Sequence, residues 1–414
     1  MLGSRNRSLT KSGDVGSSKK NDDATPKEYS KNAGSSKKND DATSKKRSKN
    51  AEKVSWLLFV LIILGLLAAV FFYGVFFIDY FRRPAKSMAP LVESSVHVMY
   101  VFGDSTVAAG DFLMTPFPYG IDWPNRITKN ESKGRFCNGY TVADLLAKSL
   151  NIPIPQSYNF PDKKRVKLDG SGINFASAGC GLLQATRPYV GFECYPILDQ
   201  IHQMLYGPKK WDAKARFNEA VYVISVGGND LMFSLKGKDP TVFARQLGSE
   251  MGNLLKTLYE KVGGRTYFVN NVGPLGCIPN NRERNGLEKE CNQELNVAAV
   301  EYNRVLDEVL LNFSRISDDS TVVVVADSHK LFSLLLESPA MFGFSNATAP
   351  CCGAWVDSEG MFVCNSTYPL CSKSERDGYI FFDGAHTTAS ANQKFLELCV
   401  DEKICSVVGD GELL

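Results

Sequence analysis

Two short segments, far apart in the sequence, contain residue types that together can cleave an acyl bond. Residues 101–106 read Val-Phe-Gly-Asp-Ser-Thr and contain Ser105, while residues 383–386 read Asp-Gly-Ala-His and contain Asp383 and His386. An aspartate and a histidine three residues apart lie on one side of a turn, so the carboxylate can orient the imidazole. A serine with a histidine as its general base is a nucleophile. The pattern predicts nucleophilic catalysis at Ser105, although a Gly-Asp-Ser tripeptide alone is usually an ordinary turn.

Two further segments contain small residues and an amide that could bind a developing negative charge. Asn229 lies in Val-Gly-Gly-Asn-Asp at residues 226–230, and Gly179 lies in Ala-Gly-Cys-Gly at residues 178–181. Amide and backbone N–H groups are the donors that the oxyanion of a tetrahedral intermediate needs. Either segment alone is more often a plain strand-to-helix turn. Their occurrence in this order, each after an apolar run, favours a joint role.

The elements that would position these residues are short strands alternating with helices. Helical periodicity occurs between the apolar runs, and each run ends in Gly, Asn, Asp or Ser. This alternation predicts an α/β fold, a three-layer α/β/α sandwich with a five-stranded parallel sheet, whose carboxyl edge is the expected ligand crevice. The predicted strands lie within residues 96–102, 172–176, 220–226, 266–270 and 321–326.

With these motifs in place, the sequence resembles the plant GDSL esterase/lipases of the SGNH hydrolase superfamily. The resemblance runs from about residue 96 to residue 405, and it rests on many separated matches in one order. The matching segments are residues 102–105, 134–139, 172–177, 227–230, 273–279, 351–353 and 376–383. The Gly-x-Ser-x-Gly elbow of α/β-hydrolases is absent, which is consistent with this family.

The resemblance implies a flavodoxin-like SGNH hydrolase fold and an acyl-enzyme mechanism with no metal and no cofactor. It makes Ser105 the nucleophile, His386 the base and Asp383 the residue that orients the base. The oxyanion hole would consist of the Ser105 backbone N–H, Asn229 and Gly179 or a glycine near it.

The sequence departs from the family's usual pattern beside the nucleophile and beside the base. The proposed catalytic set stays intact, so we expect these differences to affect substrate preference. Thr106 stands in place of leucine, Ala108 in place of aspartate, Asp111 in place of asparagine and Ala178 in place of glycine, while Ala385 and Thr387 flank His386 where an aromatic residue and a proline are common.

Other histidines and cysteines are expected to have structural roles. His329 follows the last predicted strand and is interpreted as a loop or packing residue. Cys137 and Cys180 fall within motifs, where packing or a disulfide is favoured over nucleophilic chemistry. Cys277 and Cys291 bracket a polar loop and are a plausible bridge, and the count of 11 cysteines leaves at least one unpaired. With no Cys-x-x-Cys pair and only four histidines, disulfides are favoured over a metal site.

The N-terminal part of the chain has a different composition from the rest. Residues 1–53 carry 14 Lys/Arg and 7 Asp/Glu and contain a repeat of period 18, which predicts a disordered basic cytosolic tail. Trp56 begins a run of 23 residues without a charge, so residues 54–80 are predicted to be a transmembrane helix. Residues 81–95 are then a stem, 96–406 the hydrolase domain and 407–414 a C-terminal tail. The positive-inside rule predicts a single-pass type II membrane protein with a lumenal or extracellular catalytic domain.

Two further patterns agree with an oxidising compartment. The cysteines lie mostly in the C-terminal half, and Asn130, Asn312, Asn346 and Asn365 are predicted glycosylation sites. The anchor favours the Golgi or endoplasmic reticulum over the plasma membrane.

We therefore expect an O-acetyl or similar ester of a polysaccharide or glycan to be the substrate. A lipase acting on acyl lipids and an acyltransferase with the same triad are alternatives, and a catalytically silent binding protein is the alternative of another class. A nucleic-acid partner is not expected.

Overall fold

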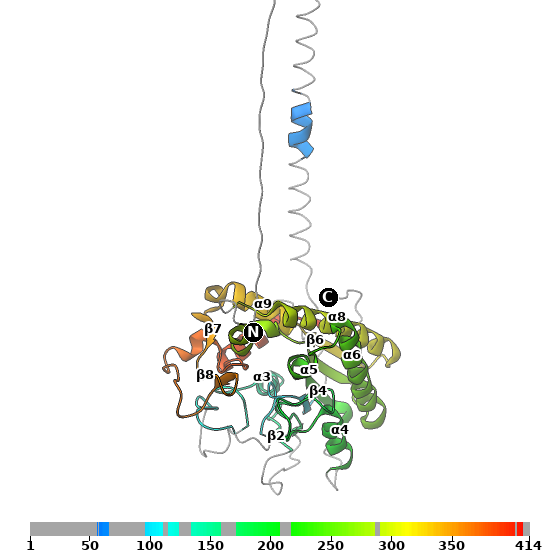
Figure 1. Cartoon of the computed structure of the whole chain (residues 1–414). Coiled ribbons are helices and arrows are strands. Elements are labelled where there is room, and N and C mark those ends of the chain that lie inside the picture. The colour runs from blue at the N-terminus through cyan, green and yellow to red at the C-terminus, as the bar shows by residue number, and fades with distance from the viewer. Residues whose placement is uncertain are drawn as a thin grey trace, which may run out of the picture. The chain divides into compact units, whose positions relative to one another are not determined.

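The computed structural model describes residues 56, 58–65, 96–110, 115–123, 134–158, 171–207, 217–285, 290–401 and 404–408 (Figure 1). The chain divides into two units, Met1–Arg83 and Pro84–Leu414. The predicted tail, the stem and most of the predicted transmembrane segment lie outside the described residues, as do Asp111, Asn130 and the chain after residue 408.

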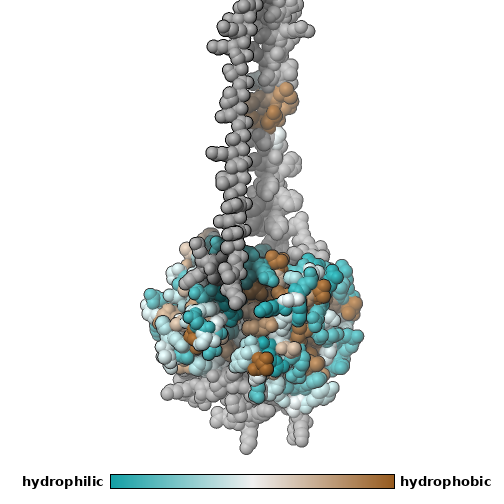
Figure 2. All heavy atoms as spheres, in the orientation of Figure 1, coloured by the Kyte–Doolittle hydropathy of each residue, from teal (hydrophilic) through white to brown (hydrophobic). Residues whose placement is uncertain are grey.

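Little of the first unit is described. Trp56 and residues 58–65 are helical, and their large apolar side chains are mostly exposed, as the brown colour in Figure 2 shows. Within the described ranges, no helix is both long enough and apolar enough to cross a membrane.

The second unit is built on a mostly parallel central sheet, and all five predicted strands are present. They are β1 (Val98–Gly103), β3 (Gly172–Asn174), β4 (Ala220–Ser225), β5 (Thr266–Asn270) and β6 (Val322–Ala326). Their order across the sheet is β3-β1-β4-β5-β6, all paired in parallel. Both faces of these strands are covered, which explains their nearly continuous apolar sequences. This is the flavodoxin-like strand order, with a crossover switch between β1 and β4.

The predicted parallel strands are confirmed, and the described residues add two more strands to the same sheet. The two additional strands lie at its edges. β2 (Gln156–Ser157) pairs in parallel with β3, and β11 (Cys405–Val407) pairs in antiparallel fashion with β6. The sequences of these two strands, Gln-Ser and Cys-Ser-Val, lack the apolar run by which the other five strands were predicted.

Helices cover both faces of the sheet and form the predicted three layers. One core cluster packs beneath α4 (Ile197–Tyr206), α5 (Gly228–Ser234), α6 (Pro240–Thr257) and α8 (Gln293–Ile316). The other packs beneath α3 (Val142–Ser149), α9 (Ser328–Glu337) and α10 (Ala389–Asp401). Side-chain oxygens cap the N-termini of four of these helices: Thr141 caps α3, Asp239 caps α6, Asn292 caps α8 and Asp327 caps α9.

A small accessory region precedes α10 and leads into the site. It contains α7 (Pro279–Asn285), the parallel pair β7 (Asn346–Pro350) and β10 (Tyr379–Phe381), and the antiparallel pair β8 (Ala354–Val356) and β9 (Met361–Val363). The bridges Cys351–Cys371 and Cys352–Cys364 cross-link it.

The disulfides agree with the cysteine pattern. The predicted bridge Cys277–Cys291 is present, and Cys180 pairs with Cys194. Cys399–Cys405 ties β11 to α10. Cys137 is the unpaired cysteine among the described residues, and it is buried.

Candidate active site

Ser105 lies on a tight turn at the carboxyl end of β1. The turn starts at Gly103, where φ is +151° and a Cβ would lie 2.2 Å from the carbonyl oxygen of Ser225 on β4. Only glycine allows that approach. Buried Gln200 from α4 holds the same residue on both sides, because its Oε1 accepts from the Gly103 N–H at 2.9 Å and its Nε2 donates to the Gly103 carbonyl at 2.8 Å. Ser105 is therefore fixed at the switch between β1 and β4, where such sheets bind ligands.

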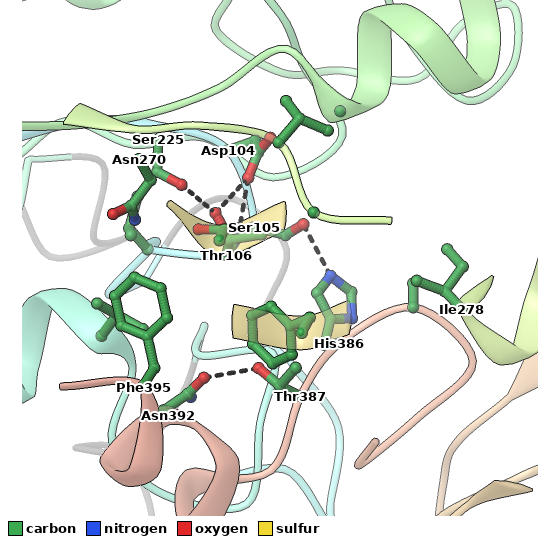
Figure 3. Close-up of a pocket in the computed structure, with 18 of the residues that line it drawn as sticks. Asp104, Ser105, Thr106, Ser225, Asn270, Ile278, His386, Thr387, Asn392 and Phe395 are labelled. Atoms are coloured by element: carbon green, nitrogen blue, oxygen red, sulfur yellow. Dashed lines mark hydrogen bonds between the residues drawn. The ribbon is translucent and has the colours of Figure 1, made fainter. Parts of the chain in front are cut away.

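The structure brings the three residues of the predicted catalytic set together. His386 Nε2 lies 2.7 Å from Ser105 Oγ (Figure 3). On the other side of the ring, His386 Nδ1 lies 2.8 Å from Asp383 Oδ2. These distances are those of direct hydrogen bonds. Ser105 lies between β1 and the next turn, whereas Asp383 and His386 lie on the loop between β10 and α10.

The Asp383 carboxylate is surrounded by donors. Its Oδ1 accepts from the backbone N–H groups of Ala385 (2.8 Å) and His386 (2.7 Å), and its Oδ2 accepts from the Tyr119 hydroxyl at 2.5 Å. Phe136 packs beside the base, with 5.1 Å between its ring centroid and that of His386. Phe136 lies within a segment matched to the family pattern, so the sequence could have indicated it. Tyr119 lies in a loop with no motif and could not be found that way.

The pKa values of the pair shift in the directions that an ion pair produces. Burial favours the neutral form of Asp383, but His386 and the hydrogen bonds outweigh burial, so the pKa of Asp383 is lowered. Burial likewise disfavours protonated His386, but the Asp383 carboxylate outweighs it, and the pKa of His386 is raised. Asp383 is therefore ionised at neutral pH and stabilises the imidazolium that proton transfer from Ser105 would form.

The neighbouring Asp104 belongs to the turn, and its carboxyl group also raises the pKa of His386. Its Oδ1 accepts from the Thr106 N–H at 3.0 Å and from the Thr106 hydroxyl at 2.7 Å. Burial raises the pKa of Asp104 to about 6 against the lowering effect of these two bonds. Its carboxyl group thus shapes the turn that presents Ser105.

The segments predicted for the oxyanion hole contact each other. Asn229, at the start of α5, donates from Nδ2 to the Cys180 carbonyl at 2.8 Å. Gly179 has a φ of +77°, and a Cβ there would lie 2.5 Å from the ring of Phe192. Neither residue lines the cavity beside Ser105, whereas Gly228 does.

A buried carboxylate organises the loop that follows β3. Asp230 accepts from the backbone N–H groups of Leu182 (2.9 Å) and Leu183 (3.0 Å) and from the Thr186 hydroxyl (2.6 Å). The bridge between Cys180 and Cys194 closes the same loop.

A cavity of about 160 Å³ opens beside Ser105 and His386 (Figure 3). Much of its wall is apolar, with side chains from α9, α10 and the segments after β1 and β5. These include Val107, Phe332, Leu336 and Phe395. Polar side chains lie among them, including Ser225, Asn270 and Asn392.

The other candidate nucleophiles and bases take no part in this hydrogen-bonded set, although Cys137 lines the cavity beside Ser105. Cys137 is buried, its thiol donates to the Gly139 carbonyl, and burial raises its pKa to about 12, so it is not a thiolate. Burial lowers the pKa of His329, which lines a second pocket and not the cavity at Ser105. His97 precedes β1 and is exposed. In the described part of the chain, no cluster of His, Cys, Asp or Glu is arranged to hold a metal ion.

Three of the four predicted glycosylation sites lie in described segments. Asn312 is exposed on α8, while Asn346 and Asn365 are partly exposed. The amide oxygens of the latter two accept backbone N–H groups in turns. Glycosylation of these residues stays a prediction.

Comparison with known proteins gives one family. The model of the GDSL-like lipase/acylhydrolase family matches residues 99–398. The GDSL esterase/lipase LTL1 of Arabidopsis thaliana is 31% identical over 359 residues, covering 80% of this chain and 90% of that protein.

Solved structures resemble the chain only distantly. Phospholipase A1 from Streptomyces albidoflavus NA297 is 12% identical with a TM-score of 0.34, covering 74% of this chain and 98% of that chain. A family two carbohydrate esterase from Clostridium thermocellum is 17% identical with a TM-score of 0.31, covering 59% and 55%. Likeness at this level carries no argument about the substrate.

Proposed function

The chain belongs to the GDSL-like lipase/acylhydrolase family and is an ester hydrolase, and we propose that it cleaves carboxylic esters through an acyl enzyme on Ser105. The observation that carries this proposal is the continuous hydrogen-bonded connection from Ser105 Oγ through His386 to Asp383. A serine hydroxyl is a weak nucleophile until a neighbouring base removes its proton.

The first half of the reaction follows from these contacts. His386 Nε2 takes the proton of Ser105 Oγ at 2.7 Å while Oγ attacks the ester carbonyl carbon. The imidazolium is stabilised by Asp383, and it then gives its proton to the leaving alcohol as the C–O bond breaks. Water deprotonated by His386 attacks the acyl-serine in the second half, which releases the acid and restores the serine.

The oxyanion would be bound by groups at the ends of β1, β3 and β4. The Asn229 amide donates one of its two N–H groups to the Cys180 carbonyl, and the second N–H can donate to the substrate oxygen. We assign the Ser105 and Gly179 backbone N–H groups to the same role. Because Asn229 and Gly179 do not line the cavity proposed for the acyl group, this assignment puts the oxyanion outside that cavity. Removal of one such donor costs about 10²–10³ in kcat in related chemistry.

The cavity bears on the acyl group. An apolar cavity of roughly 150 Å³ can hold a benzene molecule, and the cavity beside Ser105 measures about 160 Å³. This size supports an acyl group of about four to six carbons over both acetate and a fully enclosed long chain. Esters of a polysaccharide or glycan remain our proposed class on the alcohol side, and acyl lipids are the alternative.

The test uses the purified full chain with p-nitrophenyl esters of increasing acyl length. We expect hydrolysis with a maximum near butanoate to hexanoate, and loss of turnover in Ser105→Ala. Ser328→Ala is the matched control, because Ser328 lines the same cavity without contacting the triad. Equal turnover by wild type and Ser105→Ala would support a silent binding protein. Product transfer to an added alcohol in preference to water would support an acyltransferase.

The natural alcohol is tested with xylan, pectin and a triacylglycerol that all carry the acyl group preferred in the p-nitrophenyl series. Release of acid from one polysaccharide alone would support the proposed class and identify the substrate. Strong preference for the triacylglycerol would contradict it.

We also propose the single-pass type II topology, with the catalytic unit in the lumen of the Golgi or endoplasmic reticulum. Support comes from the 23 uncharged residues that start at Trp56 and from the basic residues before them. Protease protection of the catalytic unit in intact microsomes is the expected result. Digestion by external protease would contradict this topology.

A further inference from the structure

One polar atom in the cavity wall has no hydrogen-bond partner. Asn270, the last residue of β5, lines the cavity beside Ser105 and is only 6% exposed. Its amide oxygen Oδ1 is buried, and no donor contacts it among the residues that the structure describes. Buried amide oxygens are nearly always paired, so an exception in a substrate cavity indicates a partner that arrives from outside the protein.

The surroundings of Asn270 extend the polar area toward the nucleophile. Asn270 is the register partner of Ser225 in the parallel pair β4–β5, so the two residues lie next to each other on neighbouring strands. The Ser225 hydroxyl lies 2.9 Å from the Thr106 hydroxyl, and Thr106 directly follows Ser105. Figure 3 shows Asn270 and Ser225 on the side of Thr106 that lies away from His386.

The cavity wall includes a second polar pair, which lies beside the base. Thr387, which follows the base, donates to Asn392 Oδ1 on α10 at 2.6 Å, and both residues line the cavity. Thr106 and Thr387 are two of the positions where the sequence departs from its family's pattern. This chain therefore has polar side chains at positions beside both the nucleophile and the base. The Asn270 side chain makes no hydrogen bond within the described residues, so its amide can turn and present the buried oxygen to the cavity.

We propose that Asn270 accepts a hydrogen bond from a hydroxyl group on the acyl part of the substrate, so that the enzyme selects esters of hydroxy acids. This inference rests on the proposed acyl-serine function. The acyl group is the part of the ester that enters the cavity, because buried side chains such as Phe395 and Val107 enclose it, whereas the alcohol must leave to solvent. A hydroxyl is suited to the site because it is neutral, and its oxygen can also accept from the Asn270 amide N–H.

The test compares hexanoate with its hydroxylated forms in the purified full chain. The value of kcat/KM is measured for the p-nitrophenyl esters of hexanoate and of 2-, 3- and 6-hydroxyhexanoate. We expect at least one hydroxylated ester to exceed hexanoate by about tenfold or more, since a site built to bind a hydroxyl rejects the analogue that lacks it. If no hydroxylated ester exceeds hexanoate, Asn270 Oδ1 holds only a water molecule and the proposal is overturned.

Substitution assigns the preference to Asn270. Leucine has a similar shape to asparagine and no acceptor. In Asn270→Leu, the ratio of kcat/KM for the preferred hydroxyhexanoate ester to kcat/KM for the hexanoate ester should therefore fall to about one. Asn270→Ser, whose hydroxyl is too short to reach the same position, should lower the ratio as well and serves if the leucine variant does not fold. A ratio that stays at the wild-type value in a folded variant would overturn the proposal.

The matched control is the next residue along the chain. Asn271 also lines the cavity, but its amide is satisfied within the protein, donating to Asp327 at 2.8 Å and accepting from the His329 N–H at 3.1 Å. Asn271→Ala should keep the wild-type ratio, and an equal fall of the ratio there would count against a specific role for Asn270. Turnover that survives Ser105→Ala would contradict the acyl-serine mechanism instead, and the wild-type ratio would still report on Asn270.

Discussion

Two buried aspartates hold the two loops that face Ser105, and their pKa values shift in opposite directions. Asp383 holds the base loop through Tyr119, two backbone N–H groups and His386. Asp230 holds the loop after β3 through Thr186 and two backbone N–H groups. Burial favours the neutral form of both carboxyl groups, but the pKa of Asp383 is lowered while that of Asp230 is raised.

The difference lies in the partner that can carry a charge. Asp230 accepts only neutral donors, and these do not fully offset burial. Asp383 faces an imidazole that can become a cation, and this attraction together with the hydrogen bonds to the carboxylate outweighs burial. Similar hydrogen bonding therefore serves architecture in one loop and, under the proposed mechanism, charge stabilisation in the other.

The largest difference between the two aspartates is expected for Asp383→Asn. An amide cannot stabilise the imidazolium and favours the wrong tautomer of His386, so kcat should fall on the order of 10⁴-fold. The rate of p-nitrophenyl butanoate hydrolysis measures this, with circular dichroism to verify the fold. A folded variant that loses less than tenfold would show that Asp383 is as architectural as Asp230.

The loop after β3 is also closed by a disulfide, and its removal separates the covalent contribution from that of Asp230. Cys180 and Cys194 are 14 residues apart, so replacing both by alanine should cost about 3 kcal/mol of unfolding free energy. The pair Cys399–Cys405, 6 residues apart, is the control and should cost about 2 kcal/mol. Denaturant unfolding gives both values. Only removal of the Cys180–Cys194 bridge should also lower kcat, because Asn229 donates to the Cys180 carbonyl. An equal loss of kcat in the two double-alanine variants would contradict this connection between the bridge and Asn229.

A smaller effect is expected for Asp230→Asn. The new amide group would face N–H donors that now share a carboxylate, and the resulting unsatisfied groups should cost about 1–3 kcal/mol of stability. Its kcat should fall far less than that of Asp383→Asn. Urea midpoints and turnover of the two variants, measured side by side, decide this, and equal losses of kcat would remove the distinction between the loops.

The sequence predicted the elements whose signal is local. Strands such as β4 are buried on both faces and give uninterrupted apolar runs, and Ser105, Asp383 and His386 lie in short segments with recognisable spacing. The edge strands β2 and β11 escaped because they lack such an apolar run.

The contacts that tune the site could not be predicted in the same way. Tyr119 reaches Asp383 across 264 positions of sequence, and Gln200 reaches Gly103 across 97. Such pairs depend on how the loops are folded against the sheet, and neither residue belongs to a motif. The unpaired oxygen of Asn270 is a property of its neighbours, so only the structure can reveal it.

The smallest expected effect, and the most direct evidence for the charge that Asp383 faces, is a change in the pKa of His386. The hydrolysis requires a neutral imidazole, so kcat/KM should rise with pH through a pKa above the usual 6.5 of histidine, because Asp383 raises it. In Asp383→Asn burial is opposed only by the more distant Asp104 carboxyl group, and the pKa of His386 should fall. Asp230→Asn should leave it unchanged.

Imidazole resonances report this pKa even where turnover is weak, and the chain has only four histidines. Asp104, with a pKa of about 6, titrates near His386, so the imidazole signal itself and not the pH profile alone should be followed. The direction of the His386 pKa shift also determines how the stability of the folded protein depends on pH. A folded-state pKa above the unfolded value stabilises the protein fully below about pH 6.5 and loses that contribution as pH rises through the folded pKa. If the His386 pKa were the same in wild type and Asp383→Asn, the two aspartates would differ in their hydrogen bonds alone and not in the charge they face.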